Sequence, residues 1–111
     1  MGLLNLFNST RIARQADRLA NEVAHMTADM VYRRVAPTAT SMNDNMARGY
    51  VRAHASVAVR SAIGRTFGNR ADLAAVLNHG VQDRATTQVV HMIHNQLRMA
   101  RAQQATQRKA A

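Results

Sequence analysis

Arginine dominates the chemistry that this sequence could carry. The 111 residues include 15 Lys and Arg against 6 Asp and Glu, a formal net charge of +9, and Lys109 is the single lysine. A guanidinium group is always charged, and its planar fork suits phosphate and carboxylate groups. The sequence therefore predicts a polyanionic partner, with nucleic acid first and an anionic membrane surface second. A compositional bias toward arginine on a solvated face is the alternative explanation.

The arginines group into faces rather than into one continuous run. Side chains three, four or seven positions apart lie on the same face of a helix. Such faces could follow the phosphates of nucleic acid, and binding would then weaken as salt is added. Aromatic residues make up only 4% of the chain, so recognition of single strands by stacking is not expected. The predicted nucleic-acid-binding residues are Arg11, Arg14, Arg18, Arg48, Arg52, Arg84, Arg98, Arg101 and Arg108.

One stretch loosely resembles a helix-turn-helix motif. Residues 72–81 would form its first helix and turn, and residues 83–88 would open a second helix with polar side chains directed toward bases. The match is imperfect, because the turn is about one residue long and Thr86 stands where an apolar residue usually packs. A corner of an ordinary helical bundle has the same pattern and is the simpler explanation.

The acidic residues do not suggest a catalytic site. Glu22 is the only glutamate, and its nearest acidic neighbour, Asp17, is five residues away, a spacing that shares a helix face poorly. The chain has no cysteine, no glycine-rich phosphate loop and no nucleophile elbow. We therefore predict that the protein is not an enzyme and uses no cofactor and no small-molecule substrate.

Two of the five histidines lie on one helical face, since His91 and His94 are three residues apart. The known zinc motif on a helix needs a spacing of four with a glutamate after the first histidine, and a third ligand is missing nearby. We therefore predict no metal site. His25 lies three residues after Glu22 and four before Asp29, which indicates ordinary pairing at the surface.

Methionine and the apolar start of the chain could serve packing or association. Six of the seven methionines fall on predicted apolar stripes, so we interpret them as core filling, with a self-association surface as the alternative. The chain starts without the basic region and cleavage site of a signal peptide. Its first apolar side chains are expected to fold back on the protein, to insert into a partner subunit or to enter a membrane surface. They are Leu3, Leu4, Leu6 and Phe7.

The pattern of apolar residues predicts an all-α protein. These residues recur at helical spacing, and no segment alternates with period two. Three long helices over 9–36, 42–67 and 83–104 and one short helix over 70–79 predict a small antiparallel bundle. The second helix is dense in small residues and is expected to be central; a coiled-coil dimer of the long helices is the alternative. The predicted divisions are an apolar segment over 1–8, the bundle over 9–104 and a mobile basic tail over 105–111.

Polar and special residues predict where each helix begins and ends. A side-chain oxygen just before a helix can accept a hydrogen bond from a free backbone N–H group, and proline disfavours helix in the residue before it. Glycine is common directly after a helix. In chain order, the expected starts and stops are Asn8 or Ser9, Pro37, Ser41 with Asp44, Gly80 and Asp83.

These features together favour a binding protein. We predict a basic, non-enzymatic helical protein that binds nucleic acid, as an oligomer. The alternative is an assembly subunit of a larger particle or of a secretion or phage-like complex. A third class, a peripheral protein on anionic membranes, would use Leu3 to Phe7. The absence of cysteine fits a reducing compartment, and we expect a cytoplasmic protein.

Overall fold

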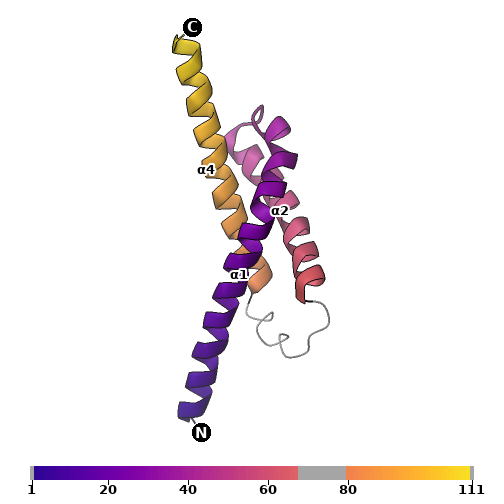
Figure 1. The fold of residues 1–111 in the computed structure, drawn as a ribbon, viewed down its shortest axis with the longest axis vertical. Coiled ribbons are helices and arrows are strands. Elements are labelled where there is room, and N and C mark those ends of the chain that lie inside the picture. Colours follow the sequence, from indigo (N-terminus) through magenta and orange to yellow (C-terminus); the bar gives the residue numbers. More distant parts are fainter. Residues whose placement is uncertain (1, 68–79, 111) are drawn as a thin grey trace.

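The structure is a computed structural model that describes the backbone of residues 2–67 and 80–110 and the side chains of 10–66 and 80–109. Its elements are α1 (Gly2–Ala39), α2 (Asp44–Phe67) and α4 (Val81–Ala110), as Figure 1 shows. The prediction of an all-α bundle is confirmed for this part of the chain. The predicted count of four helices is not matched by these three, and the expected short helix over 70–79 lies outside the described residues.

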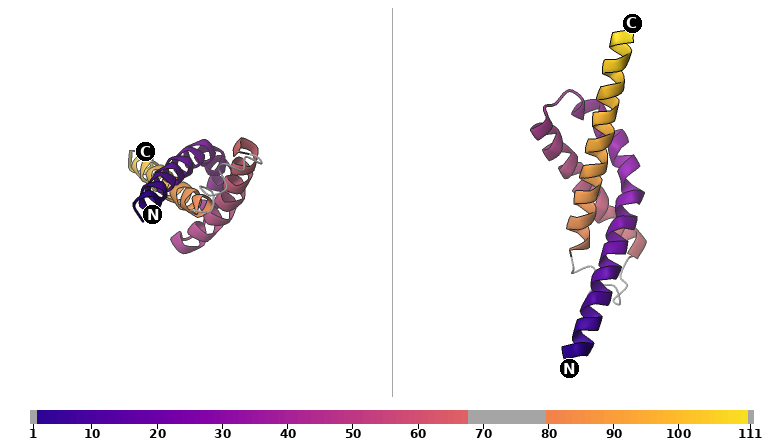
Figure 2. Two further views of the ribbon diagram at one scale, coloured as in Figure 1. Left: turned by 90° about the horizontal axis from the view of Figure 1, so that it is seen from below. Right: turned by 90° about the vertical axis from the view of Figure 1, so that its left-hand side faces the viewer.

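The first and last helices run in the same direction, and α2 runs opposite to both (Figures 1 and 2). At one end, Asp17 of α1 pairs with Arg84 of α4. At the other end, Arg101 of α4 reaches Asp44 at the start of α2 and the carbonyl oxygen of Ala39 at the end of α1. Each helix packs against the other two. The expected central position of the second helix is therefore wrong.

The molecule is elongated because α1 and α4 are longer than the region that they share with α2. An α-helix rises about 1.5 Å per residue, so α1 is about 57 Å long and α2 about 36 Å. The whole measures 68 × 26 × 20 Å. The start of α1 and the end of α4 extend past α2 at opposite ends (Figure 1). All described side chains from Ala102 to Lys109 are exposed.

The core is made almost entirely of alanine and valine. Ile93 is the largest side chain that is fully buried, and Leu97 is only 3% exposed. Short side chains let helix backbones approach closely, and dense packing then makes every methyl group count. The residues of α1 that face this core are Ala16, Ala20, Val23, Ala24, Ala28, Val31, Val35 and Ala39.

The interpretation of methionine as core filling holds only in part. Met30, Met42 and Met92 are partly buried and pack against the core, whereas three other methionines lie outside it. Met26, Met46 and Met99 are 57%, 59% and 65% exposed, and Val57 of α2 is 67% exposed. The pattern of α2 contains two apolar faces, and the face with the smaller side chains is turned inward because it allows closer contact with both neighbours. That inward face consists of Ala47, Val51, Ala55, Ala58, Val59 and Ala62.

Helix α1 begins earlier and ends later than predicted. It is continuous from Gly2, so no helix boundary lies at Asn8 or Ser9. It also passes through Pro37 to Ala39. Proline removes one backbone donor, and that loss falls on the exposed side of the last turn, whereas Ala39 is fully buried and packs in the core. Tertiary packing thus outweighs the local preference of the residue before proline.

The starts of α2 and α4 also differ from the predicted ones. Asn43 caps α2, since its Oδ1 accepts the backbone N–H of Met46 at 2.9 Å. Ser41 instead donates its hydroxyl to the carbonyl oxygen of Thr38. Helix α4 begins at Val81, so Asp83 lies inside the first turn rather than before it. A negative charge in the first turn is still favourable to the helix dipole.

Truncating Ile93 should be costly. The Ile93→Ala variant removes buried methyl groups from a core of short side chains that cannot easily close the gap. We expect a loss of about 2–4 kcal/mol in the free energy of unfolding. Met99→Ala, at an exposed site of the same helix, should change it by less than about 0.5 kcal/mol. Urea denaturation followed by circular dichroism measures both, and equal losses would contradict this core.

Alanine should have opposite effects at two glycines. Gly80 has a φ of +76°, a left-handed conformation that L side chains rarely adopt, so Gly80→Ala should destabilise the protein by about 1 kcal/mol. Gly49 lies inside α2, and a Cβ there would meet no atom within 4 Å. Gly49→Ala should therefore stabilise the protein by about 0.5–1 kcal/mol. Thermal unfolding of the two variants checks the sign of each change.

Candidate nucleic-acid interface

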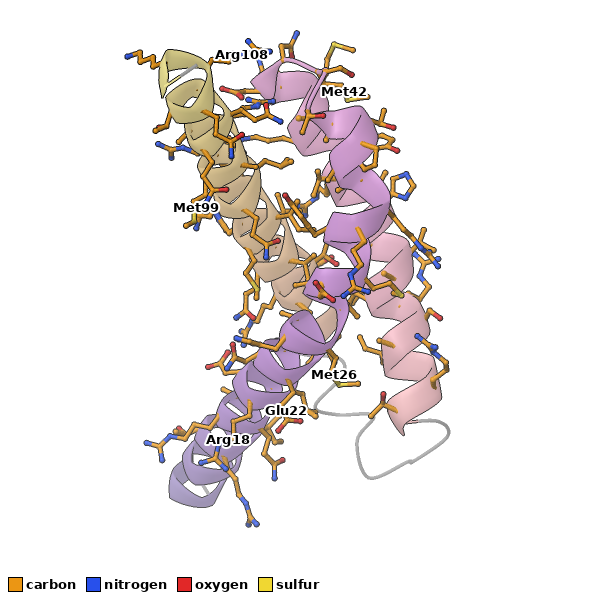
Figure 3. All side chains as sticks on the ribbon, turned by 45° about the horizontal axis from the view of Figure 1, so that its top comes forward. Arg18, Glu22, Met26, Met42, Met99 and Arg108 are labelled. Atoms are coloured by element: carbon orange, nitrogen blue, oxygen red, sulfur yellow. The ribbon has the colours of Figure 1, made fainter. Side chains whose placement is uncertain are left out.

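The predicted arginines are spread over all three helices. Arg101 is half-buried, and the others are exposed. Arg18 lies toward the start of α1 and Arg108 near the end of α4, at opposite ends of the molecule (Figure 3). The set is therefore not one compact patch. Two of these arginines, Arg84 and Arg101, form ion pairs with carboxylates of the protein. The others form no ion pair with a described residue.

Arg101 has a structural role. Its guanidinium group donates to Asp44 Oδ1 at 3.0 Å and to the carbonyl oxygens of Met42 at 3.2 Å and Ala39 at 3.4 Å. The last carbonyl groups of a helix lack partners within the helix. Arg101 satisfies two acceptors at the turn between α1 and α2 and ties that turn to α4. Its donors are thus engaged inside the protein.

Arg84 also pairs within the protein. Its guanidinium group donates to the carboxylate of Asp17 and links the first turn of α4 to α1. The remaining predicted arginines have no ion pair or side-chain hydrogen bond with any residue that the structure describes. They are Arg11, Arg14 and Arg18 on α1, Arg48 and Arg52 on α2, and Arg98 and Arg108 on α4.

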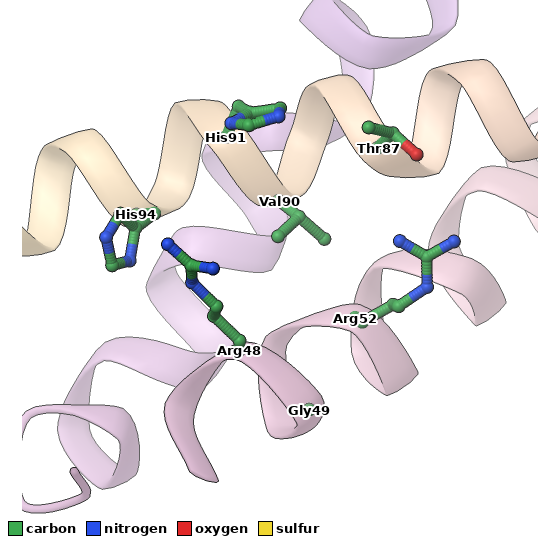
Figure 4. A pocket seen from close by; sticks show the side chains of 7 residues that line it. All are labelled: Arg48, Gly49, Arg52, Thr87, Val90, His91 and His94. Carbon is green, nitrogen blue, oxygen red and sulfur yellow. The ribbon is translucent and has the colours of Figure 1, made fainter. Parts of the chain in front are cut away.

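A hollow of about 320 Å³ lies between α2 and α4. Arg48, Gly49 and Arg52 line it from α2, and Thr87, Val90, His91 and His94 line it from α4. Figure 4 shows the guanidinium group of Arg48 near His94 and that of Arg52 directed toward Thr87. Val90 lies between the two arginines. The hollow is therefore lined by cationic or hydrogen-bonding side chains on both helices, and none of these seven residues is acidic.

Apolar side chains lie beneath this hollow. A second, much smaller space shares Arg48, Val90 and His94 with it and is bounded by the buried core residues Ala47, Val51 and Leu97. A cleft with charge of one sign and walls of low dielectric constant concentrates the electric field. The arrangement can thus attract a small anionic group more strongly than the same arginines would on a flat surface.

Sequence reasoning found the arginines of this hollow but not the partners on the facing helix. From the sequence, His91 and His94 suggest only a possible metal pair. Their spacing shows that they share a face of α4, and the spacing of Arg48 and Arg52 shows the same for α2. Local spacing does not show which face of one helix packs against which face of another. The sequence therefore does not predict that these histidines and arginines line the same hollow.

The described residues contain no group of three or more His, Cys, Asp or Glu side chains that could hold a metal ion. The predicted pairing of His25 with Glu22 or Asp29 is not observed. His25 Nδ1 donates to the carbonyl oxygen of Asn21 at 2.8 Å, and Asp29 pairs with Arg33 at 3.0 Å.

The helix-turn-helix hypothesis stays a prediction, because its first helix lies outside the described residues. The beginning of α4 can be assessed. Thr86 is 3% exposed, and its hydroxyl donates to the carbonyl oxygen of Gln82 at 2.7 Å. The hydroxyl is therefore satisfied, and threonine fills the buried position where an apolar residue was expected. Arg84, in the same turns, is held by Asp17.

No helix in the described part of the chain is long and apolar enough to cross a membrane. The predicted apolar contact residues Leu3, Leu4, Leu6 and Phe7 belong to α1, but their side chains are outside the described set. Comparison with known proteins found no matching family model, no matching curated protein and no matching solved structure.

Proposed function

We propose that this chain is a basic, non-enzymatic helical protein that binds nucleic acid through its phosphate backbone. The observation that carries the proposal is the group of exposed arginines without partners among the described residues. Phosphate is the polyanion group that the guanidinium fork fits best, through two parallel hydrogen bonds. Contacts of this kind position a protein on nucleic acid without reading its sequence.

The distribution of acidic residues supports this proposal. Three of the six acidic side chains are already in ion pairs with arginine. The other arginines of the described part of the chain form no ion pair and leave the positive charge there uncompensated. The pairs are Asp17–Arg84, Asp29–Arg33 and Asp44–Arg101.

The elongated shape also suits a long polyanion. The molecule is 68 Å long, and one turn of duplex DNA is about 34 Å. Arginines near both ends, such as Arg18 and Arg108, could then contact phosphates more than one turn apart (Figure 3). Contacts distributed in this way release several counterions on binding, so the affinity should depend steeply on salt.

Salt dependence tests this proposal. The logarithm of the association constant for a DNA duplex should fall linearly with the logarithm of the salt concentration, with a slope of about −0.9 for each phosphate contacted. Replacing Arg11, Arg14 and Arg18 with glutamine should make the slope less steep by about 2–3. Arg33→Gln, which removes a cation already paired with Asp29, should change it least. Absence of binding to duplex or single strand at about 50 mM salt would exclude the proposed function.

A second candidate, an assembly subunit, is favoured by the outer face of α2. Met46 and Val57 are 59% and 67% exposed, and with Ala53 they lie on the side of the helix opposite the core. Tyr50, beside them, is half-buried with its ring edge against His54. Exposed apolar side chains on one face, methionine among them, are typical of surfaces that contact another protein.

Light scattering after size exclusion tests the assembly candidate. If the outer face of α2 joins two copies, the protein should form an oligomer that Met46→Asp and Val57→Asp together dissociate, because each places a charge in an apolar contact. Ala102→Asp, on the exposed end of α4, should leave the oligomer intact. A wild-type protein that is monomeric at every concentration tested would argue against self-assembly through this face.

A further inference from the structure

We propose that the hollow between α2 and α4 seats one phosphate group of a nucleic-acid backbone. Arg48 and Arg52 would hold it from α2, and His91, His94 and Thr87 from α4. The inference rests on the proposed function and deepens it, because it names the group that is taken up and the side chains that take it up. It also gives His91 and His94 a role as hydrogen-bond donors to an anion.

The two arginines are available to a ligand. They lie one helical turn apart on α2, and both side chains are exposed. Neither side chain has an ion pair or hydrogen bond with a described residue, whereas Arg84 and Arg101 each have a carboxylate partner. Like charges at this spacing repel each other. An anion between the two guanidinium groups would remove that repulsion and gain charge-assisted hydrogen bonds from both.

Helix α4 supplies further hydrogen-bond donors to the hollow and no carboxylate that would repel a phosphate. A histidine ring carries at least one N–H donor in either protonation state, and a threonine hydroxyl can donate as well. Thr87, His91 and His94 line the hollow from α4. Figure 4 shows His94 on the side of Arg48, and His91 along the edge of α4 that is farther from the arginines. None of the lining residues is a carboxylate, so a phosphate would meet attraction from both walls.

The size of the hollow fits a phosphate group on a chain better than a bare ion. Its volume of about 320 Å³ is roughly ten times the share of one water molecule in the liquid. A phosphate would occupy part of this space and leave the rest for the sugar atoms attached to it. Val90 in the wall and the buried Val51 and Leu97 below it supply apolar surface, which strengthens the attraction between the phosphate and the arginines.

The histidine ring signals report directly on phosphate binding in the hollow. The chain has five histidines, and each gives separate ring signals in an NMR spectrum. Titration of the wild-type protein with a short DNA duplex, and separately with inorganic phosphate, should shift the signals of His91 and His94. His25 and His54, which do not line the hollow, should shift much less. This measurement needs no variant, so it does not depend on the folding of one.

A matched pair of double variants measures the contribution of the arginines. Arg48→Gln with Arg52→Gln should weaken duplex binding about tenfold or more, the loss expected for at least one charge-assisted hydrogen bond. Arg60→Gln with Arg65→Gln removes the same charge from exposed positions of the same helix outside the hollow. This control should lose under about threefold, from the lower net charge alone. Circular dichroism verifies that both variants remain helical.

The outcomes separate this inference from the function on which it rests. Duplex binding without shifts of His91 and His94, and with equal losses in the two double variants, would overturn the seat and leave the proposed function standing. Shifts caused by inorganic phosphate without any duplex binding would identify a site for free anions and overturn both. Absence of shifts with either ligand would also overturn the seat.

Discussion

The close approach of three helices through alanine and valine is the constraint on which the rest of the structure depends. Short side chains leave little space between the helices, so long side chains have no place inside. Arginine, methionine and histidine are therefore displaced to the outside or to the margins of the helix contacts. Ile93 and Leu97 are the largest side chains that this core contains. A core of short side chains occupies little volume, and much of the surface of each helix stays available for contacts with other molecules.

The position of α4 along the other helices is set by ion pairs as well as by packing. A contact made only of small apolar side chains tolerates sliding, because successive turns present similar surfaces. Arg84 with Asp17 at one end and Arg101 with Asp44 at the other restrict that sliding. Exposed ion pairs contribute little stability individually, so we regard their role as one of register. The register in turn decides which residues of α4 lie opposite the arginines of α2.

Two chemically different surfaces occur on α2. Arg48 and Arg52 lie on the side that borders α4, and Met46 and Val57 lie on the side opposite the core. Binding of a polyanion and contact with another protein would thus use separate faces of the same helix. The two candidate functions would therefore use different side chains of the same helix.

The sequence by itself determined the helical class, the excess of cations and the grouping of arginines by face, because helical periodicity and formal charge are local properties. Asp29 and Arg33, which are one turn apart in the sequence, form the ion pair that this spacing favours. Only the tertiary structure decided which apolar face of α2 is buried and that α1 continues past Pro37. It also decided that Arg84 and Arg101 are engaged internally and that two histidines line the same hollow as two arginines. These outcomes depend on contacts between segments far apart in the chain, and such contacts can outweigh the preference of any single residue.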